Sequence, residues 1–462
     1  MSDSSNDLAG KRATVWGLGV FGGGASVARY LAEAGAEVTV IDMKPREKLA
    51  RSVASLEDLS LRFHLGEAHR EEDLLGADLV VKSPAIPPRS EWLPRLAEAG
   101  VPVRSEIGLA LARVRVPWVA VTGSKGKTTT ASLAGALASG GGRKVLVAGN
   151  NERPLTDALK LEPEALVLEL SSFMADALAR ERAAGVEFPA PLALILTQLC
   201  PEHLNWHDGV EDYYGAKLSL KELGPRELVI PRGEPELEAR LGQDPRLVRV
   251  GGEPADARDL FWSEGWATRG QERLFPAADL CLLGAHNRTN ALLASAAALA
   301  LGAGPSDLQS GARAFEPLEH RLEPVARRGE LTFVNDSTAT TPEAAIAALE
   351  AAPKPVVLLA GGSDKGADYS ALGRAAAESA QTVVCLGVVG ERIAAAIEAA
   401  EGPAKVLRAS GTFEEAFALG LSECGPSGSL LLSPAAASYD MFANFKARGE
   451  RFGELARAAA QA

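Results

Sequence analysis

The sequence contains few of the residues that mark secreted, disulfide-bonded proteins. The 462 residues include only four cysteines, widely separated and without a C-x-x-C pair: Cys200, Cys281, Cys385 and Cys424. This scarcity argues against a disulfide framework and a zinc–thiolate site, and it is typical of the reducing cytoplasm. The opening residues, MSDSSNDLAGKR, contain no apolar run, so we do not expect them to act as a secretory signal.

The sequence also lacks an excess of positive charge and a long apolar run. The 48 Lys and Arg residues are outnumbered by 60 Asp and Glu residues, and the net charge of −12 argues against a nucleic-acid partner. The apolar run at 291–303 is too short to span a bilayer, so we expect a buried helix and no membrane contact. A composition of 47% apolar and 23% charged residues is typical of a soluble globular protein, here of about three domains.

The clearest motif is WVAVTGSKGKTTT at residues 118–130. It predicts a buried strand at 118–121, a glycine-containing loop at 123–129 and an Ala- and Leu-rich helix at 131–138. In such a loop, backbone N–H groups and the helix N-terminus bind phosphate, a lysine reaches the outer phosphates and a hydroxyl binds Mg²⁺. Lys127 and Thr128 stand at those positions. Because Val121 replaces the first glycine of the usual pattern, a purely structural turn is the alternative.

The first 114 residues begin with a βαβ pattern. Strand 13–16, the glycines of a G-x-G-x-x-G match, helix 25–34 and strand 37–41 follow one another, and Asp42 ends the second strand. This order is typical of dinucleotide-binding proteins. A glycine turn that holds some other phosphate is the broader interpretation. Since no hydride-transfer site is evident, we predict that this region holds a nucleotide or diphosphate.

In the middle of the chain, a carboxylate lies inside one apolar strand and two histidines follow another. Glu169 interrupts the apolar strand 165–170, and a buried acid near a phosphate loop usually has a partner such as Mg²⁺; a satisfied structural glutamate is the alternative. His203 and His207 have a spacing found in zinc sites, but Leu204 occupies the place of the glutamate in H-E-x-x-H. We therefore expect Glu202 and His203 to lie near a phosphate-bound metal, and we do not expect zinc.

Three polar residues farther along are less informative by themselves. Lys217 lies on a predicted helix, where composition favours an exposed lysine. Asn287 and Asn290 stand one turn apart at the start of the Ala-rich helix. They suit contacts with a nucleotide base or phosphate, and they could equally be an N-cap and a polar contact.

Residues 318–462 alternate strands with helices, which predicts a parallel sheet with its polar loops at one edge. Strands are predicted at 331–334, 356–360, 382–386 and 429–432. Three of them lead to Asp336, Lys365 and Ser438, which should converge at that edge. Converging cationic and hydroxyl groups suggest an anionic substrate such as an amino-acid carboxylate.

Nine stretches in this order make the chain resemble the Mur ligases, and especially the members that add D-glutamate. They are VTGSKGKTTT, LELSSF, PEHLNWH, YYGAKL, GAHNRTN, EHRLE, NDSTATTP, GGSDKGADY and SPAAASYDMFANFKARG. The resemblance covers nearly the whole chain and implies an α/β protein of three domains. These are a Rossmann-like UDP-sugar-binding domain at 1–114, a central P-loop ATPase-like domain with a mainly parallel sheet at 115–317, and a Rossmann-like amino-acid-binding domain at 318–462.

The resemblance implies roles for individual residues. Lys127, His203 and Lys217 would be catalytic, and Lys217 would carry a carbamate. The metal ligands, for two Mg²⁺ ions, would be Thr128, Glu169, His203 and Lys217. ATP would be bound by Gly123, Ser124, Lys125, Gly126, Lys127, Thr128, Thr129, Asn287, Asn290, Arg321 and Asp336. The UDP-sugar would contact Gly19, Val20, Phe21, Asp42, Ala85 and Asn150. The amino acid would contact Thr340, Lys365, Ser438 and Phe445.

The implied reaction is ATP-dependent joining of D-glutamate to UDP-N-acetylmuramoyl-L-alanine through an acyl phosphate, by a cytoplasmic monomer that makes a peptidoglycan precursor. Departures from the family pattern occur at Met174, Glu202, Asn205, Thr338 and the pair Asn151–Glu152. They keep open the same chemistry with L-glutamate or another nucleotide-linked acceptor. Two alternatives of other classes are a nucleotide-binding protein without ligase activity and an NAD-dependent oxidoreductase.

Overall fold

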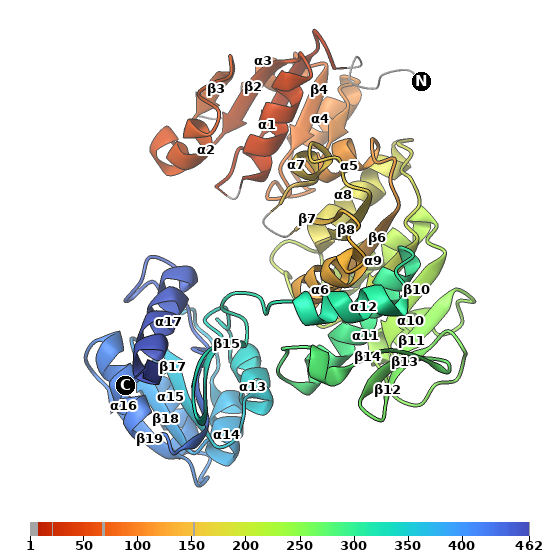
Figure 1. The fold of residues 1–462 in the computed structure, drawn as a ribbon. Helices are drawn as coiled ribbons and strands as arrows, with labels where there is room; N and C mark the ends of the chain where they lie inside the picture. The colour runs from red at the N-terminus through yellow and green to blue at the C-terminus, as the bar shows by residue number, and fades with distance from the viewer. Residues whose placement is uncertain (1–7, 21, 67–69, 151–152, 462) are drawn as a thin grey trace. The chain divides into compact units, whose positions relative to one another are not determined.

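The structure, a computed structural model, describes residues 8–20, 22–66, 70–150 and 153–461 and contains three β-sheets with helices packed on them (Figure 1). Phe21 of the predicted sugar site and the Asn151–Glu152 departure lie outside these residues. The chain divides into two compact units, one formed by Met1–Leu280 with Thr289–Phe315 and the other by Cys281–Arg288 with Glu316–Ala462. Mostly parallel sheets with intervening helices confirm the predicted α/β fold class.

The first sheet has the strand order β3-β2-β1-β4-β5, and all its strands are parallel. Its core forms where apolar side chains of β1 and β2, such as Val15 and Val40, meet the buried face of α1. The strands are β1 Arg12–Trp16, β2 Glu37–Asp42, β3 Arg62–Leu65, β4 Leu79–Lys82 and β5 Val103–Arg104. The helices are α1 Gly23–Glu33, η2 Arg46–Leu49, α2 Ala50–Ala54, α3 Glu71–Leu75 and α4 Trp92–Glu98.

The central sheet has the order β14-β13-β12-β11-β10-β9-β6-β8-β7, parallel from β7 to β12 and antiparallel from there to β14. Strand β6 lies between β8 and β9, so the loops that follow these three strands meet at one edge. The strands are β6 Trp118–Thr122, β7 Val145–Gly149, β8 Ala165–Glu169, β9 Ala193–Leu196, β10 Glu227–Pro231, β11 Leu247–Val250, β12 Leu260–Ser263, β13 Trp266–Arg269 and β14 Glu272–Pro276.

Helices of the central region pack on both faces of that sheet. They are α5 Glu106–Leu111, α6 Lys127–Ser139, α7 Leu155–Leu159, α8 Ser172–Ala183, α9 Val210–Leu218, η3 Ser219–Leu223, α10 Pro235–Leu241, η4 Ala277–Asp279, α11 Ala285–Ala300 and α12 Pro305–Ala314. Helix α6 begins at Lys127, four residues before the predicted start. Thus Lys127 and Thr128, predicted as loop residues, belong to the first turn of the helix.

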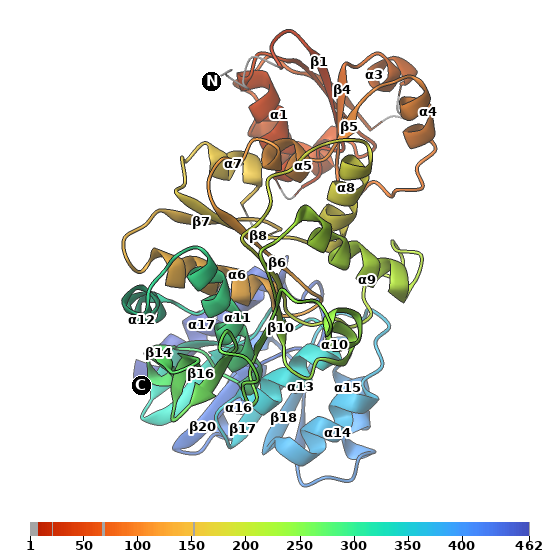
Figure 2. The same cartoon turned by 90° about the vertical axis from the view of Figure 1, so that its right-hand side faces the viewer.

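The third sheet has the order β15-β16-β20-β17-β18-β19 and is parallel except for the β15–β16 hairpin. Consecutive residues of β17 face opposite sides: Leu358 packs with α13, α14 and α15, whereas Leu359 packs with α16 and α17. Figure 2 labels these helices around the third sheet. The strands are β15 Glu323–Arg328, β16 Glu330–Asn335, β17 Val356–Gly361, β18 Thr382–Leu386, β19 Lys405–Ala409 and β20 Ser427–Leu432. The helices are α13 Pro342–Ala351, α14 Ser370–Ser379, α15 Gly390–Glu398, α16 Phe413–Ser422 and α17 Phe445–Gln461.

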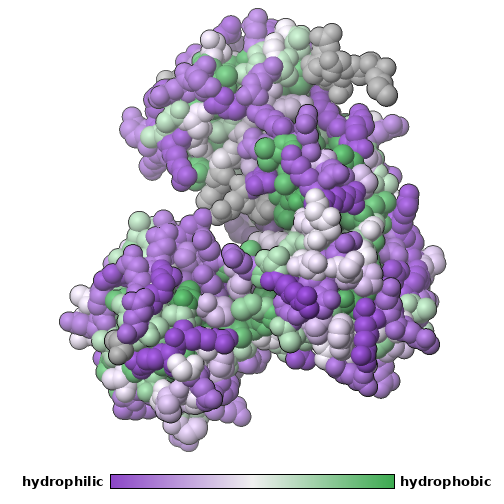
Figure 3. Space-filling model, viewed as in Figure 1, coloured by the Kyte–Doolittle hydropathy of each residue, from purple (hydrophilic) through white to green (hydrophobic). Residues whose placement is uncertain are grey.

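Each sheet falls inside one of the three predicted domain ranges, while the boundaries at 114 and 317 stay predictions. None of the described helices is long and apolar enough to cross a bilayer. On the face that Figure 3 shows, hydrophilic residues predominate and hydrophobic ones form small patches between them.

Candidate active site

A tight turn at residues 123–126 joins β6 to α6 and has the form of a phosphate-binding loop. Gly123 and Gly126 have φ angles of +143° and +85°, which L side chains rarely adopt. A Cβ on Gly123 would lie 2.0 Å from Thr197 Oγ1, and one on Gly126 would lie 2.7 Å from Asn290 Oδ1. The backbone therefore packs too closely here for any residue except glycine, and the turn leads directly into the N-terminus of α6, where phosphate oxygens can bind.

Lys127 holds this loop in shape. Its Nζ donates to the carbonyl oxygens of Gly123, at 2.9 Å, and Ser124, at 2.8 Å. The side chain thus curls back over the turn from the first residue of α6, and the ammonium group lies at the helix N-terminus. A positive charge beside the helix dipole gives the site the electrostatics that a triphosphate requires.

Glu169 ends β8 beside the loop and is 1% exposed. Its Oε1 accepts hydrogen bonds from Thr128 Oγ1, at 3.3 Å, and Asn150 Nδ2, at 3.0 Å. Its Oε2 is buried and has no hydrogen-bond partner among the residues that the structure describes. A buried carboxylate oxygen without a donor is costly, and a hard cation would satisfy it. The pair of Thr128 and Glu169 therefore fits Mg²⁺.

Lys217 approaches the same loop from α9, and the interpretation of it as an exposed lysine is wrong. It is 1% exposed, its Nζ donates to Gly123 O at 2.7 Å, and it lies 4.7 Å from the centroid of the Tyr213 ring. Burial, and next the positive charge of Lys127, lower the pKa of Lys217 to about 7. Near neutral pH a large fraction of this amine is thus uncharged and nucleophilic.

The two histidines have different surroundings. His207 is buried, with Nδ1 3.0 Å from Asp212 Oδ2 and Nε2 2.9 Å from Ser172 Oγ. Since both its ring nitrogens are occupied, His207 cannot form a zinc site with His203 without losing these bonds. The absence of a zinc site at this pair stays a prediction.

His203 lies beside the phosphate loop in a strained backbone conformation, with φ of +55°. Its ring centroid is 4.9 Å from that of Phe173. Partial desolvation, with the charges of Lys217 and Lys127, lowers the pKa of His203, so the ring is neutral at pH 7 and able to bind a metal or accept a proton. In the described part of the chain no group of three or more His, Cys, Asp or Glu residues could hold a metal alone. Water, hydroxyl and phosphate oxygens would have to complete a Mg²⁺ site.

The residues predicted to bind the UDP-sugar fall in two loops of the first sheet and at the end of β7. Asp42 accepts backbone N–H groups from Gly19, at 3.0 Å, and Lys44, at 2.9 Å, so it braces the glycine loop. Val20 is 44% exposed beside it. Ala85 lies exposed after β4, while Asn150 donates to Glu169. These side chains remain candidates for the sugar nucleotide.

The residues predicted to bind the amino acid, and Asp336 predicted for ATP, lie after strands of the third sheet, whereas Arg321 precedes its first strand. Asp336 follows β16 and accepts from Leu322 N, at 3.1 Å, and Ser433 Oγ, at 2.8 Å. Burial raises the pKa of Asp336 to about 7. Lys365 is exposed and Ser438 is buried. The remaining predicted residues of this unit are Arg321, which is exposed, Thr340, which is half-buried, and Phe445, which begins α17.

Tyr213 also contacts these groups, although it was not predicted as a site residue. Its Oη lies 3.0 Å from Ser124 Oγ and 3.4 Å from Glu202 Oε2, and burial raises its pKa. The side chain is fully buried on α9, one turn before Lys217. The i, i+4 spacing of an aromatic ring and a lysine is the only local signal that could have indicated it.

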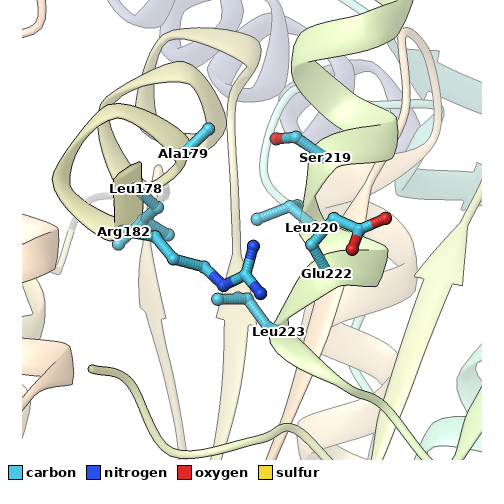
Figure 4. Close-up of a pocket in the computed structure, with 7 residues that line it drawn as sticks. All are labelled: Leu178, Ala179, Arg182, Ser219, Leu220, Glu222 and Leu223. Atoms are coloured by element: carbon cyan, nitrogen blue, oxygen red, sulfur yellow. The ribbon is translucent and has the colours of Figure 1, made fainter. Parts of the chain in front are cut away.

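A cavity of about 60 Å³ lies between α8 and η3 (Figure 4). Arg182 and Glu222 extend along its two sides in that view. Ligand pockets for small molecules occupy roughly 300–1,000 Å³. The cavity is thus too small for a nucleotide, and none of its lining residues belongs to the phosphate loop.

Family models match most of the chain. The description "Mur ligase MurD-like, N-terminal domain" applies to residues 11–105, "Mur ligase middle domain" to 121–298 and "Mur ligase, glutamate ligase domain" to 320–436. The three matches follow the order of the three sheets. The central one contains the phosphate loop, Glu169, His203 and Lys217.

Similar proteins extend over nearly the same length. A UDP-N-acetylmuramoylalanine–D-glutamate ligase of Roseiflexus sp. (strain RS-1) is 36% identical over 96% of this chain and 98% of the relative. One of Symbiobacterium thermophilum is 34% identical over 97% of this chain and 98% of the relative. Among solved structures, the UDP-N-acetylmuramate-alanine ligase MurC of Thermotoga maritima has a TM-score of 0.58 at 20% identity, covering 96% of this chain and 98% of that chain. At this identity the structural likeness shows the shared fold.

Proposed function

Because the chain belongs to the Mur ligase family, we propose that it adds D-glutamate to UDP-N-acetylmuramoyl-L-alanine at the expense of ATP. The observation that carries this proposal is the grouping of Lys127, Lys217 and Glu169 around one phosphate loop, where one oxygen of Glu169 has no hydrogen-bond partner among the described residues. The match to a glutamate ligase domain and the names of the similar proteins support the choice of amino acid.

In the first step, a carboxylate oxygen of UDP-N-acetylmuramoyl-L-alanine attacks the γ-phosphorus of ATP and forms a new P–O bond. The bond to the bridging oxygen breaks, and ADP leaves with the electron pair. Such a transfer depends on positioning and charge neutralisation, so no serine or cysteine nucleophile is required. Lys127 and the N–H groups of the loop bind the phosphates, and Mg²⁺ at Thr128 and Glu169 would supply further positive charge.

In the second step, the amine of D-glutamate attacks the acyl carbon and phosphate leaves. The ammonium form is not nucleophilic, so the incoming amine must lose a proton. His203, whose ring is neutral at pH 7, is available to accept it or to bind metal. The polar groups after β16, β17 and β20 are candidates for the carboxylates of the amino acid.

Lys217 has a second role in this proposal. Its neutral amine adds to CO₂, forming an N–C bond, and loss of a proton leaves a carbamate with the charge of a carboxylate. A lysine that is 1% exposed and has a pKa of about 7 is suited to this reaction. The anionic group would bind a second Mg²⁺ near the loop. Labelling with ¹³C-bicarbonate and detection of a carbamate carbon by NMR would test it without any turnover.

Phosphate release from ATP tests the proposed reaction. The purified protein is assayed with UDP-N-acetylmuramoyl-L-alanine and with D-glutamate, L-glutamate or no amino acid. Release with D-glutamate alone is expected. Preference for L-glutamate would keep the chemistry and change the specificity, whereas no release despite ATP binding would refute the proposed reaction.

A companion test uses Lys217→Ala. This change should nearly abolish ligation, and acetate should partly restore it, because a carboxylate can enter the space that the modified side chain leaves. Full activity of the variant would rule out the carbamate.

We further propose that the protein acts in the cytoplasm as a monomer, during synthesis of the peptidoglycan precursor that cell-wall growth and division require. Light scattering with size-exclusion chromatography would check its oligomeric state.

A further inference from the structure

Lys125 and Glu202 form an ion pair that joins two neighbouring loops of the central sheet. Lys125 lies inside the phosphate loop, and Glu202 lies in the segment that follows β9. Their side chains are 52% and 24% exposed. The Lys125 ammonium is thus engaged by a carboxylate, unlike that of Lys127, which donates to carbonyl oxygens of the loop.

Further hydrogen bonds tie the same two loops together. Ser124 N donates to Gln198 O at 2.6 Å, and Ser124 Oγ lies 2.8 Å from Cys200 O and 3.0 Å from Cys200 N. Tyr213 Oη reaches both Ser124 Oγ and Glu202 Oε2. The second oxygen of Glu202 is therefore also held, so the carboxylate has a fixed position rather than a mobile surface one.

His203 comes directly after Glu202 and has the left-handed φ of +55°. Such a conformation in a non-glycine residue costs free energy and persists only where its neighbours fix it. On the C-terminal side, His203 O accepts hydrogen bonds from Trp206 N and His207 N, both at 3.0 Å. On the N-terminal side, the neighbouring residue Glu202 is held through its carboxylate by Lys125 and Tyr213.

We propose that the Lys125–Glu202 pair is a clasp that positions His203 against the phosphate loop. Lys125 then acts through Glu202 and not as a direct phosphate ligand. The clasp keeps the Glu202 carboxylate from repelling the triphosphate, and it couples the loop that binds ATP to the segment that carries His203. The structural part stands on the contacts above, and the part that concerns catalysis rests on the proposed function.

A double-mutant cycle with Lys125→Met, Glu202→Gln and the combined variant tests the clasp. We expect each single change to lower kcat/KM for ATP by about fivefold, a size typical of coupled contacting residues, and the combined variant to be no worse than either. The KM for D-glutamate should stay constant. The charge-reversed pair, Lys125→Glu with Glu202→Lys, should recover most of the loss. If Lys125→Met is equally harmful with and without Glu202, Lys125 binds phosphate directly and the clasp is refuted.

Lys405 and Glu423 give a matched control. They form a Lys–Glu pair of similar exposure, 55% and 21%, in the third-sheet unit, and neither has a role in the proposed site. Lys405→Met and Glu423→Gln should leave kcat and both KM values unchanged.

Hydrogen exchange tests the clasp independently of the catalytic activity. Amides of residues 200–207 should exchange faster in either single variant than in the parent. In the combined variant they should exchange no faster than in the single variants. If the parent lacks ligase activity but shows this pattern, the proposed function fails while the clasp stands. If the exchange of 200–207 does not change, the clasp is refuted whatever the activity.

Discussion

Replacing Lys217 by methionine should stabilise the protein in mildly acidic solution, although it removes a residue that we place in the active site. The ammonium group is buried, and after burial the largest cause that lowers its pKa is the charge of another cation, Lys127. Methionine has a similar length and no charge to desolvate. The Gly123 carbonyl keeps its hydrogen bond from Lys127, so the substitution leaves no unpaired acceptor there.

The size of the stabilisation and its dependence on pH follow from the pKa of Lys217. A fall from 10.5 in the unfolded chain to about 7 in the folded protein corresponds to at most about 5 kcal/mol against folding. Between these two pH values the unfolded chain binds more protons than the folded one, so the stability of the parent rises with pH. Below pH 7 nearly the full cost of burying the charged lysine opposes folding. From pH 6 to pH 9 the advantage of Lys217→Met should therefore shrink by about 2–3 kcal/mol.

Urea unfolding followed by tryptophan fluorescence can measure this difference. All six tryptophans lie at or before residue 266, so the signal reports the unit that contains Lys217. Buffers must be free of CO₂, because a carbamate would add a charge to the parent at pH 9. The exposed Lys48→Met serves as the control and should show no such trend. An equal stability difference at pH 6 and pH 9 would refute the reasoning.

Three further predictions concern other sites. Glu169→Gln should raise the Mg²⁺ concentration for half-maximal activity at least tenfold, roughly the cost of losing one carboxylate ligand; an unchanged Mg²⁺ titration would show that the carboxylate binds no metal. His207→Ala should lower the free energy of unfolding by about 2–4 kcal/mol, because it leaves Ser172 and Asp212 without their partner. An unchanged midpoint of thermal denaturation would contradict this expectation. Thr412→Ala removes the capping box of α16 and should cost about 1 kcal/mol in urea unfolding followed by circular dichroism, with kcat and KM unchanged.

The strands that position the site were predictable because they are short apolar runs followed by turn residues. The β12–β14 hairpins were not predicted, since segments such as Glu272–Pro276 mix charged and apolar residues without a clean alternation. The start of α6 was also placed too late. Three of its first four residues, Thr128 to Thr130, have weak helix propensity, and the loop geometry rather than composition makes them helical.

The site was predictable where chemistry appears in the local sequence and not where it depends on tertiary burial. An acid inside an apolar strand indicated that Glu169 needs a partner, and its Oε2 has no hydrogen-bond partner within the described part of the chain. The burial of Lys217 had no local signal, because α9 lacks a distinct polar face. The Lys125–Glu202 pair joins residues 77 positions apart, which one sequence cannot reveal. The roles of these residues with ATP and metal stay predictions.

The position of β20 in the third sheet has a consequence for biosynthesis. This strand lies between β16 and β17, yet it is made after β17, β18 and β19. At bacterial rates, the roughly 100 residues from the end of β16 to the end of β20 take about 5–20 s to translate. During that interval the facing edges of β16 and β17 have unpaired backbone groups and are open to pairing with another chain. Translation that stalls between these strands would therefore produce an aggregation-prone fragment, whereas the central sheet is already complete.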